Sequence, residues 1–121
     1  MGDNIVKSKS FSFAVRVVKL YQYLCADKKE FVLSKQLLRS GTAVGALIRE
    51  AEHAESKQDF IHKFGIAQKE ANEVVYWLEL LKATDYLNEK EYESIEEEAV
   101  VILKLITSIL KTSKGQINNK Q

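Results

Sequence analysis

The sequence lacks proline altogether, and it contains one cysteine and five glycines among 121 residues. A single cysteine, Cys25, cannot form an internal disulfide and excludes a zinc site built from four cysteines. No apolar run approaches the roughly 18 residues of a membrane-spanning helix, and the first residues lack the charged and then apolar pattern of a signal peptide. We therefore expect a cytoplasmic protein without a membrane partner.

The chain also lacks an excess of charge of either sign, because 18 basic and 17 acidic residues give a net charge of +1. The distribution is uneven: residues 1–48 hold eight basic and three acidic residues, a net charge of +5, and residues 49–121 hold ten and fourteen, a net charge of −4. Such asymmetry either marks a binding face or reflects solvated helix faces. The basic residues that cluster around the first predicted helix and its exit loop are Arg16, Lys19, Lys28, Lys29, Lys35 and Arg39. We take them as candidate nucleic-acid-binding residues for salt-sensitive contact with an RNA or DNA backbone.

Apolar residues recur at intervals of three and four throughout the chain, which predicts helices and no strands. Four helical segments joined by short loops are typical of an all-α, antiparallel up-down four-helix bundle, which we place at residues 10–115. Residues 1–9 are expected to be disordered, and residues 116–121 are expected to be frayed. The most regular apolar seam belongs to the third segment and consists of Phe60, Phe64, Ala67, Ala71, Val74, Leu78 and Leu81.

Local signals predict where these helices begin and end. Ser34, Ser56 and Asn88 precede apolar periodic segments, as helix N-caps do. Gly115 follows the last apolar residues of the fourth segment and is expected to end that helix. Gly41 and Gly45 lie on one face of the second segment, where each costs about 1 kcal/mol of helix propensity. We expect a neighbouring helix of the same subunit to approach there.

The third segment carries more apolar surface than a single bundle buries. Four large side chains lie well away from its seam, and they are Ile66, Tyr76, Trp77 and Leu80. A helix that is apolar on more than one face is usually buried on more than one face, so we expect these residues to form an oligomer interface. A bent bundle that covers these side chains by itself is the alternative.

Two short patterns have the composition of a metal site. Glu50 and His53, and Asp59 and His62, have the spacing that di-metal bundles use. Both patterns flank one turn instead of facing each other, and the first predicted helix has no carboxylate between residues 10 and 26. Cys25 has no histidine near it in the sequence. We therefore predict no catalytic residue, no metal ligand and no cofactor, and we do not expect an enzyme.

Residues 36–51, with the sequence QLLRSGTAVGALIREA, resemble a known family. The stretches SKQDF at 56–60, IAQKEA at 66–71 and YWL at 76–78 support the resemblance. These motifs are similar to the small four-helix-bundle proteins encoded in intervening sequences of bacterial 23S ribosomal RNA genes. The accessory variability proteins of diversity-generating retroelements belong to the same group. One departure is Leu47, where the family often has asparagine.

The resemblance implies a homopentameric barrel of four-helix bundles, with a basic surface that engages nucleic acid or a nucleic-acid-processing protein. It implies no catalytic residues. Our expectation is therefore a non-catalytic, self-assembling bundle that serves as a nucleic-acid-binding or ribonucleoprotein accessory. A structural or protein-interaction module without nucleic-acid affinity is the competing interpretation.

Overall fold

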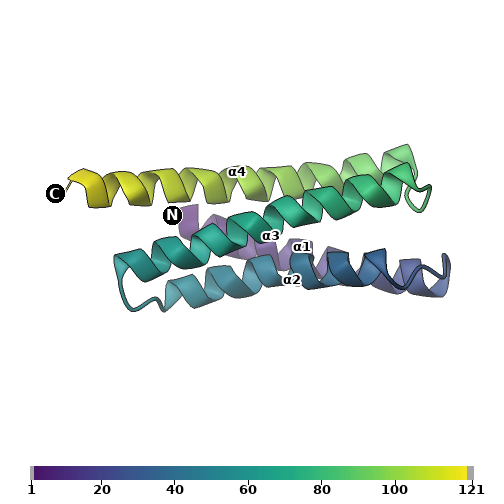
Figure 1. Ribbon diagram of the computed structural model, residues 1–121, viewed down its shortest axis with the longest axis horizontal. Helices are drawn as coiled ribbons and strands as arrows, with labels where there is room; N and C mark the ends of the chain where they lie inside the picture. Colours follow the sequence, from purple (N-terminus) through teal and green to yellow (C-terminus); the bar gives the residue numbers. More distant parts are fainter. Residues whose placement is uncertain (1, 120–121) are drawn as a thin grey trace.

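The computed structural model describes residues 2–119 and contains four helices joined by short loops (Figure 1). The helices are α1 (Gly2–Ala26), α2 (Leu33–Glu52), α3 (Lys57–Ala83) and α4 (Glu89–Asn119). Each helix packs against the next one along the chain, and α1 also packs against α4. The backbones of α1 and α3, and those of α2 and α4, do not come close to each other, so these pairs lie diagonally across the bundle. The predicted four-helix bundle is confirmed.

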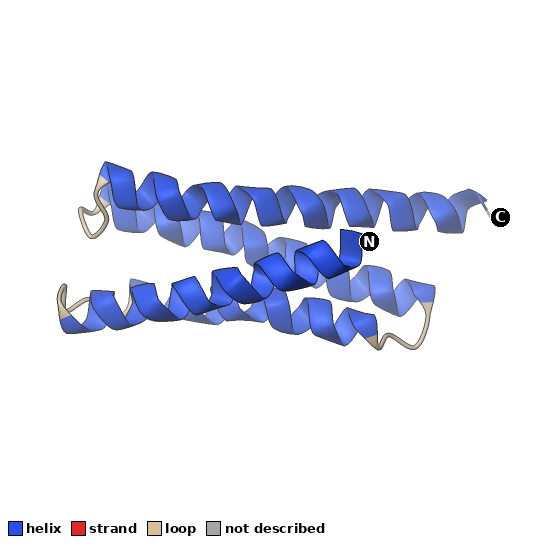
Figure 2. Cartoon of the chain, turned by 180° about the vertical axis from the view of Figure 1, so that it is seen from behind, coloured by secondary structure: helices blue, strands red, loops and turns tan. Residues whose placement is uncertain are grey.

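The loops divide between the two ends of the molecule. The α1–α2 and α3–α4 turns lie at one end, and the α2–α3 turn lies at the other end, together with the start of α1 and the end of α4 (Figure 1). The view from behind brings α1 to the front and shows the same division of the loops (Figure 2). Residues far apart in the sequence, at 27–32 and 84–88, therefore share one end of the bundle.

The core follows the predicted seams. In α3, six of the seven predicted seam residues are buried and Phe60 is half-buried, with its ring centroid 4.7 Å from that of Phe64. The other three helices contribute mainly Val17, Leu24, Leu37, Val44, Ile102 and Ile106. A repeat of four and three residues favours neighbouring helices whose axes are nearly aligned, and the four helices run along the same long axis (Figure 1).

Two of the predicted N-caps are confirmed. The Ser56 hydroxyl accepts a hydrogen bond from the Asp59 amide at 3.0 Å. At the start of α4, the Asn88 side chain accepts from the Glu91 amide at 2.8 Å, and the Glu91 carboxylate accepts from the Asn88 amide at 2.9 Å. This reciprocal pair satisfies two amides that the helix itself leaves without partners.

The third predicted N-cap, Ser34, is wrong. α2 begins at Leu33, and Ser34 is buried in its first turn with its hydroxyl donating to the Glu30 carbonyl at 2.8 Å. The capping acceptor is the Glu30 carboxylate, which accepts from the amides of Val32, Leu33 and Ser34 at 3.0, 2.9 and 2.6 Å. A carboxylate at a helix N-terminus also interacts favourably with the helix dipole. Its two oxygens satisfy more amides than one serine hydroxyl could.

Both expected chain ends need correction. Residues 2–9 are helical, because the buried Val6 joins the core and Lys7 forms an ion pair with Glu52 at 2.8 Å. At the other end, α4 continues through Gly115 to Asn119, so Gly115 does not end the helix and residues 116–119 extend it. Met1 and residues 120–121 lie outside the described residues.

The junction between α1 and α4 is the loosest of the four helix contacts. A hollow of about 400 Å³ lies along it and is lined by Ser8, Lys9, Ser12, Glu97, Glu98, Val101 and Ile102. A second hollow of about 340 Å³ is lined by Arg16, Lys19, Leu20, Tyr23, Leu87, Glu91 and Ile95. Between residues 2 and 119, no helix is long and apolar enough to span a lipid bilayer.

Candidate nucleic-acid interface and association faces

Arg16 is held across the α1–α4 junction. One guanidinium nitrogen pairs with the Glu98 carboxylate and donates to the Ser94 carbonyl at 3.2 Å, and the other donates to the Ser94 hydroxyl at 2.7 Å. The side chain is 40% exposed, so it sits partly against these groups. Its donors are directed at α4, which leaves few of them for a phosphate group.

Arg39 is held on a different side of the bundle. It joins α2 to α3 through ion pairs with Glu70, at 3.2 Å, and Glu73. The Glu73 carboxylate also accepts a hydrogen bond from the indole nitrogen of Trp77 at 3.3 Å. Ion pairs at such exposed positions contribute only about 0–1 kcal/mol each. They nevertheless neutralise the charge that Arg39 would offer to a polyanion.

Lys28, Lys29 and Lys35 form the cationic part of the predicted site that the structure does bring together. They lie in the α1–α2 turn and the first turn of α2, and all three are exposed. None of them takes part in an ion pair with another described residue. We call these three residues the turn lysines. Lys19 is exposed on α1 and lines the second hollow instead.

The predicted oligomer residues of α3 differ in exposure, and Trp77 packs partly against the core. Tyr76 is 55% exposed, and Ile66, Trp77 and Leu80 are half-buried within the single chain. The rings of Tyr76 and Trp77 meet edge to face, with centroids 5.0 Å apart. Ile66, Tyr76, Trp77 and Leu80 are called the α3 patch below.

A second apolar surface lies on α1 and escaped the sequence reasoning. Phe11, Val15 and Val18 are 55%, 39% and 36% exposed. Their spacing of four and three places them on one helix stripe, roughly opposite the buried Phe13 and Val17. This α1 stripe is visible in the sequence as a second set of apolar residues at helical spacing, offset from the first.

The candidate metal residues are engaged in local structure. Glu50 pairs with Lys63 at 2.9 Å, and the Asp59 carboxylate accepts from the Glu55 amide at 3.1 Å. His53 is the C-cap residue of α2. Among the described residues, no three His, Cys, Asp or Glu side chains are grouped so that they could hold a metal ion.

Cys25 is half-buried beside α2, with its sulfur 3.9 Å from the Ser34 hydroxyl. The side chain thus packs at the α1–α2 contact.

Comparison with known proteins identifies the family. The family model described as 23S rRNA-intervening sequence protein matches residues 2–108. A crystal structure of a protein of unknown function from the S23 ribosomal protein family of Bacteroides thetaiotaomicron VPI-5482 is 58% identical. The match covers 92% of this chain and 99% of that chain, with a TM-score of 0.91. No curated protein matches the sequence. The chain belongs to the 23S rRNA-intervening sequence protein family.

Proposed function

We propose that this protein is non-catalytic and self-associates head to tail, with the α1 stripe of one copy packing against the α3 patch of the next. The observation that supports the proposal is that the α1 stripe and the exposed ring of Tyr76 in the α3 patch belong to diagonal helices. Because α1 and α3 are diagonal in the bundle, their outer faces point to opposite sides of it. Contiguous exposed apolar side chains are typical of association surfaces.

Two different surfaces on opposite sides favour a heterologous contact over a two-fold dimer. A repeated head-to-tail contact closes into a ring when the rotation per subunit permits it. The homopentamer that the family resemblance implies is such a ring. Phe11 and Tyr76, each 55% exposed, would be the principal contacts because aromatic side chains dominate interface energetics.

Mixing two variants tests the head-to-tail contact. Phe11→Ser with Val18→Ser removes the α1 stripe, and Tyr76→Ser with Leu80→Ser removes the α3 patch. We expect each variant alone to elute as a 13.8 kDa monomer in light scattering, while the wild-type protein has a multiple of that mass. An equimolar mixture should form a dimer and stop there, because each copy then keeps one intact surface. A monomeric wild-type protein, or an assembled α3 variant, would contradict the proposal.

A second candidate function is binding of a nucleic-acid backbone through the turn lysines. The supporting observation is that these three residues are exposed and lack ion pairs with described residues. In a ring, the lysines would be repeated on every copy, and avidity would increase the affinity without a new contact. Titration of labelled RNA at low and moderate salt tests this function, because phosphate contacts weaken steeply with salt. Absence of binding at low salt would favour a protein-interaction module.

A further inference from the structure

The α1–α2 turn is fixed by a dense set of hydrogen bonds. The Glu30 carboxylate is occupied by three amides, and its own amide donates to the Leu24 carbonyl at 3.0 Å. The Asp27 amide donates to the Tyr23 carbonyl at 2.8 Å. Lys29 has a φ of 56°, the left-handed conformation that closes the turn. The conformation of the turn is thus determined by its own backbone and by Glu30.

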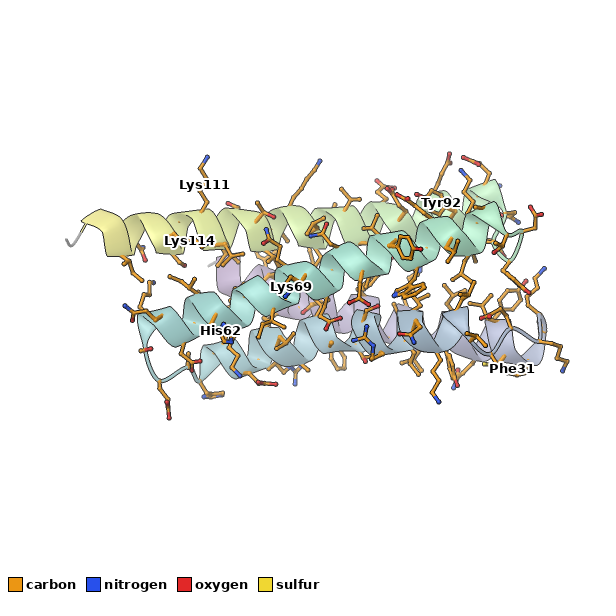
Figure 3. The ribbon with its side chains drawn as sticks, viewed as in Figure 1. Phe31, His62, Lys69, Tyr92, Lys111 and Lys114 are labelled. Carbon is orange, nitrogen blue, oxygen red and sulfur yellow. The ribbon has the colours of Figure 1, made fainter. Side chains whose placement is uncertain are left out.

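On this fixed turn, two large apolar side chains face the solvent. Val32 is 70% and Phe31 57% exposed, the two highest values among the large apolar residues whose side chains are described. Phe31 lies at the end of the bundle that holds the α1–α2 turn (Figure 3). A fixed turn cannot fold these side chains inward, so they remain available to a partner.

The charged residues around Phe31 indicate the chemistry of a partner that would fit this surface. Lys28, Lys29 and Lys35 are exposed on both sides of it in the sequence, and Asp27 is the exposed acid of the same segment. Glu30 is 7% exposed, and its oxygens already accept backbone amides. A partner that carries both negative charge and a flat apolar face complements this surface. Unpaired nucleotides have that chemistry, because the phosphates meet lysines and the base stacks on an aromatic ring.

The same end of the bundle is unsuited to a flat anionic surface. The α3–α4 turn lies there too, with Asp85 exposed in it and Glu93 exposed in the first turns of α4, while Glu89 is paired with Lys82 at 2.8 Å. A lipid bilayer would have to approach these acids as well as the lysines. A flexible single strand can follow the α1–α2 turn alone.

We propose that Phe31 is a base-stacking residue for single-stranded nucleic acid, with the turn lysines holding the flanking phosphates. The proposal rests on the second candidate function above and deepens it. It gives that function a preference for unpaired over duplex strands, because a duplex does not offer the face of a base.

Three variants separate stacking from general apolar contact. Phe31→Leu keeps an apolar side chain, Phe31→Trp keeps an aromatic ring, and Ile5→Ala shortens an exposed apolar side chain outside the turn and outside the α1 stripe. The probe is fluorescence anisotropy of labelled oligouridine, compared with a duplex of similar length at low salt. Phe31→Leu should weaken oligouridine binding about five-fold or more and leave duplex binding unchanged. Phe31→Trp should retain the affinity, with quenching of the added indole fluorescence. Ile5→Ala should have no effect.

The possible failures are distinguishable. If the wild-type protein binds no RNA at low salt, both the second candidate function and the stacking proposal fail. If binding depends on the turn lysines but Phe31→Leu and Phe31→Trp bind oligouridine with equal affinity, the second candidate function stands and the stacking proposal is overturned. If Phe31→Leu instead abolishes binding to anionic phosphatidylserine vesicles while RNA is not bound, the turn contacts lipid and the proposal is also overturned. Circular dichroism of each variant shows that the bundle is intact.

Discussion

Gly41 of α2 lies against Val17 of α1 so closely that a methyl group on Gly41 would come within 2.8 Å of Val17 Cγ1 and 2.9 Å of Cγ2. Gly45, one turn further along α2, has a different environment. A methyl group there would meet the Ser10 carbonyl oxygen at 3.5 Å, which is an ordinary contact distance. The glycine at 41 therefore sets the approach of α1 to α2 within one subunit, as expected, and the glycine at 45 does not require the absence of a side chain.

The first prediction is that alanine has opposite effects at these two positions. Gly41→Ala should lower the free energy of unfolding by about 1 kcal/mol, because overpacking against a buried β-branched side chain outweighs the gain in helix propensity. Gly45→Ala should raise it by about 0.5–1 kcal/mol, because only the propensity gain remains. Urea unfolding at one protein concentration measures both values, since self-association would make stability depend on concentration.

The clash at Gly41 can be verified with a double-mutant cycle. Val17→Ala alone should destabilise the protein by creating a cavity. Combined with Gly41→Ala, its cost should be smaller than the sum of the two single costs, because the added methyl group then occupies the space left by Val17. Additive costs would show that the Gly41 methyl group meets another obstacle.

The second prediction concerns pH and follows from the Glu30 cap. Burial by itself raises the pKa of the Glu30 carboxyl, but the hydrogen bonds from the Leu33, Ser34 and Val32 amides outweigh it and hold the pKa below the ordinary value of 4.5. A group whose pKa is lower in the folded state stabilises that state above its unfolded pKa. This stabilisation is lost as the pH falls from about 4.5 through the folded-state value.

Glu30→Gln should lower the free energy of unfolding at neutral pH by about 1–3 kcal/mol, the range for losing hydrogen bonds to a charged acceptor. The difference between the variant and the wild-type protein should shrink as the pH falls below 4.5, because the wild-type carboxyl is protonated first in the unfolded chain and then, at lower pH, in the folded cap. Denaturant unfolding of both proteins over this pH range measures the effect. A difference that stays constant with pH would exclude the charged cap. Glu55→Gln, at an exposed position, is the matched control.

The third prediction uses the end of α3. The Tyr86 amide donates to the Leu81 carbonyl at 2.9 Å and the Asp85 amide donates to the Lys82 carbonyl at 3.1 Å, which is the pattern of a Schellman motif. Asp85 occupies its left-handed position with a φ of 68°, where glycine fits without strain. Asp85→Gly should therefore stabilise the protein by about 0.5–1 kcal/mol.

The neighbouring position is the control for Asp85→Gly. Thr84 has a φ of −103° and its hydroxyl donates to the Leu80 carbonyl at 2.7 Å. Thr84→Gly should be destabilising, because it removes this hydrogen bond and adds chain flexibility without relieving strain. Thermal unfolding of the two variants side by side should give shifts of opposite sign. Shifts of the same sign would rule out strain relief at Asp85.

The fold could be predicted from the sequence wherever local chemistry decides the structure. The α3 seam repeats every three or four residues, and the caps at Ser56 and Asn88 need only residues within the same turn. The start of α1 could not be predicted, because its stability depends on Val6 reaching the core and Lys7 reaching Glu52. The Glu30 cap also departs from local rules, since a glutamate replaces the usual short N-cap side chain.

For the candidate site too, the local features could be predicted from the sequence and the contacts between distant residues could not. The turn lysines are close together in the sequence, so their common location follows from one short turn. The ion pairs of Arg16 and Arg39 are with Glu98, Glu70 and Glu73, at separations that helix periodicity does not reveal. Sequence reasoning therefore grouped six basic residues, of which the structure directs two toward carboxylates.

The fourth prediction separates these two kinds of basic residue. Replacing the three turn lysines by glutamine should weaken RNA binding and reduce the slope of log affinity against log salt by about 2, because each lost contact with a single strand contributes about 0.7. Replacing Arg16 and Arg39 by glutamine should leave the slope nearly unchanged, since their charges are already paired. Anisotropy titrations at several salt concentrations measure both slopes.

Lys111→Gln with Lys114→Gln provides the matched control for charge alone. Both lysines are exposed on α4, toward the end of the bundle that lies opposite Phe31 (Figure 3). If binding is localised to the α1–α2 turn, this variant should retain the wild-type slope despite losing two positive charges. If the Lys111 and Lys114 variant lowered the salt slope as much as the variant of the turn lysines does, RNA binding would depend on net charge over the whole surface. An equal loss from the arginine variant would mean that the nucleic acid displaces the carboxylates and that Arg16 and Arg39 join the turn lysines in the interface.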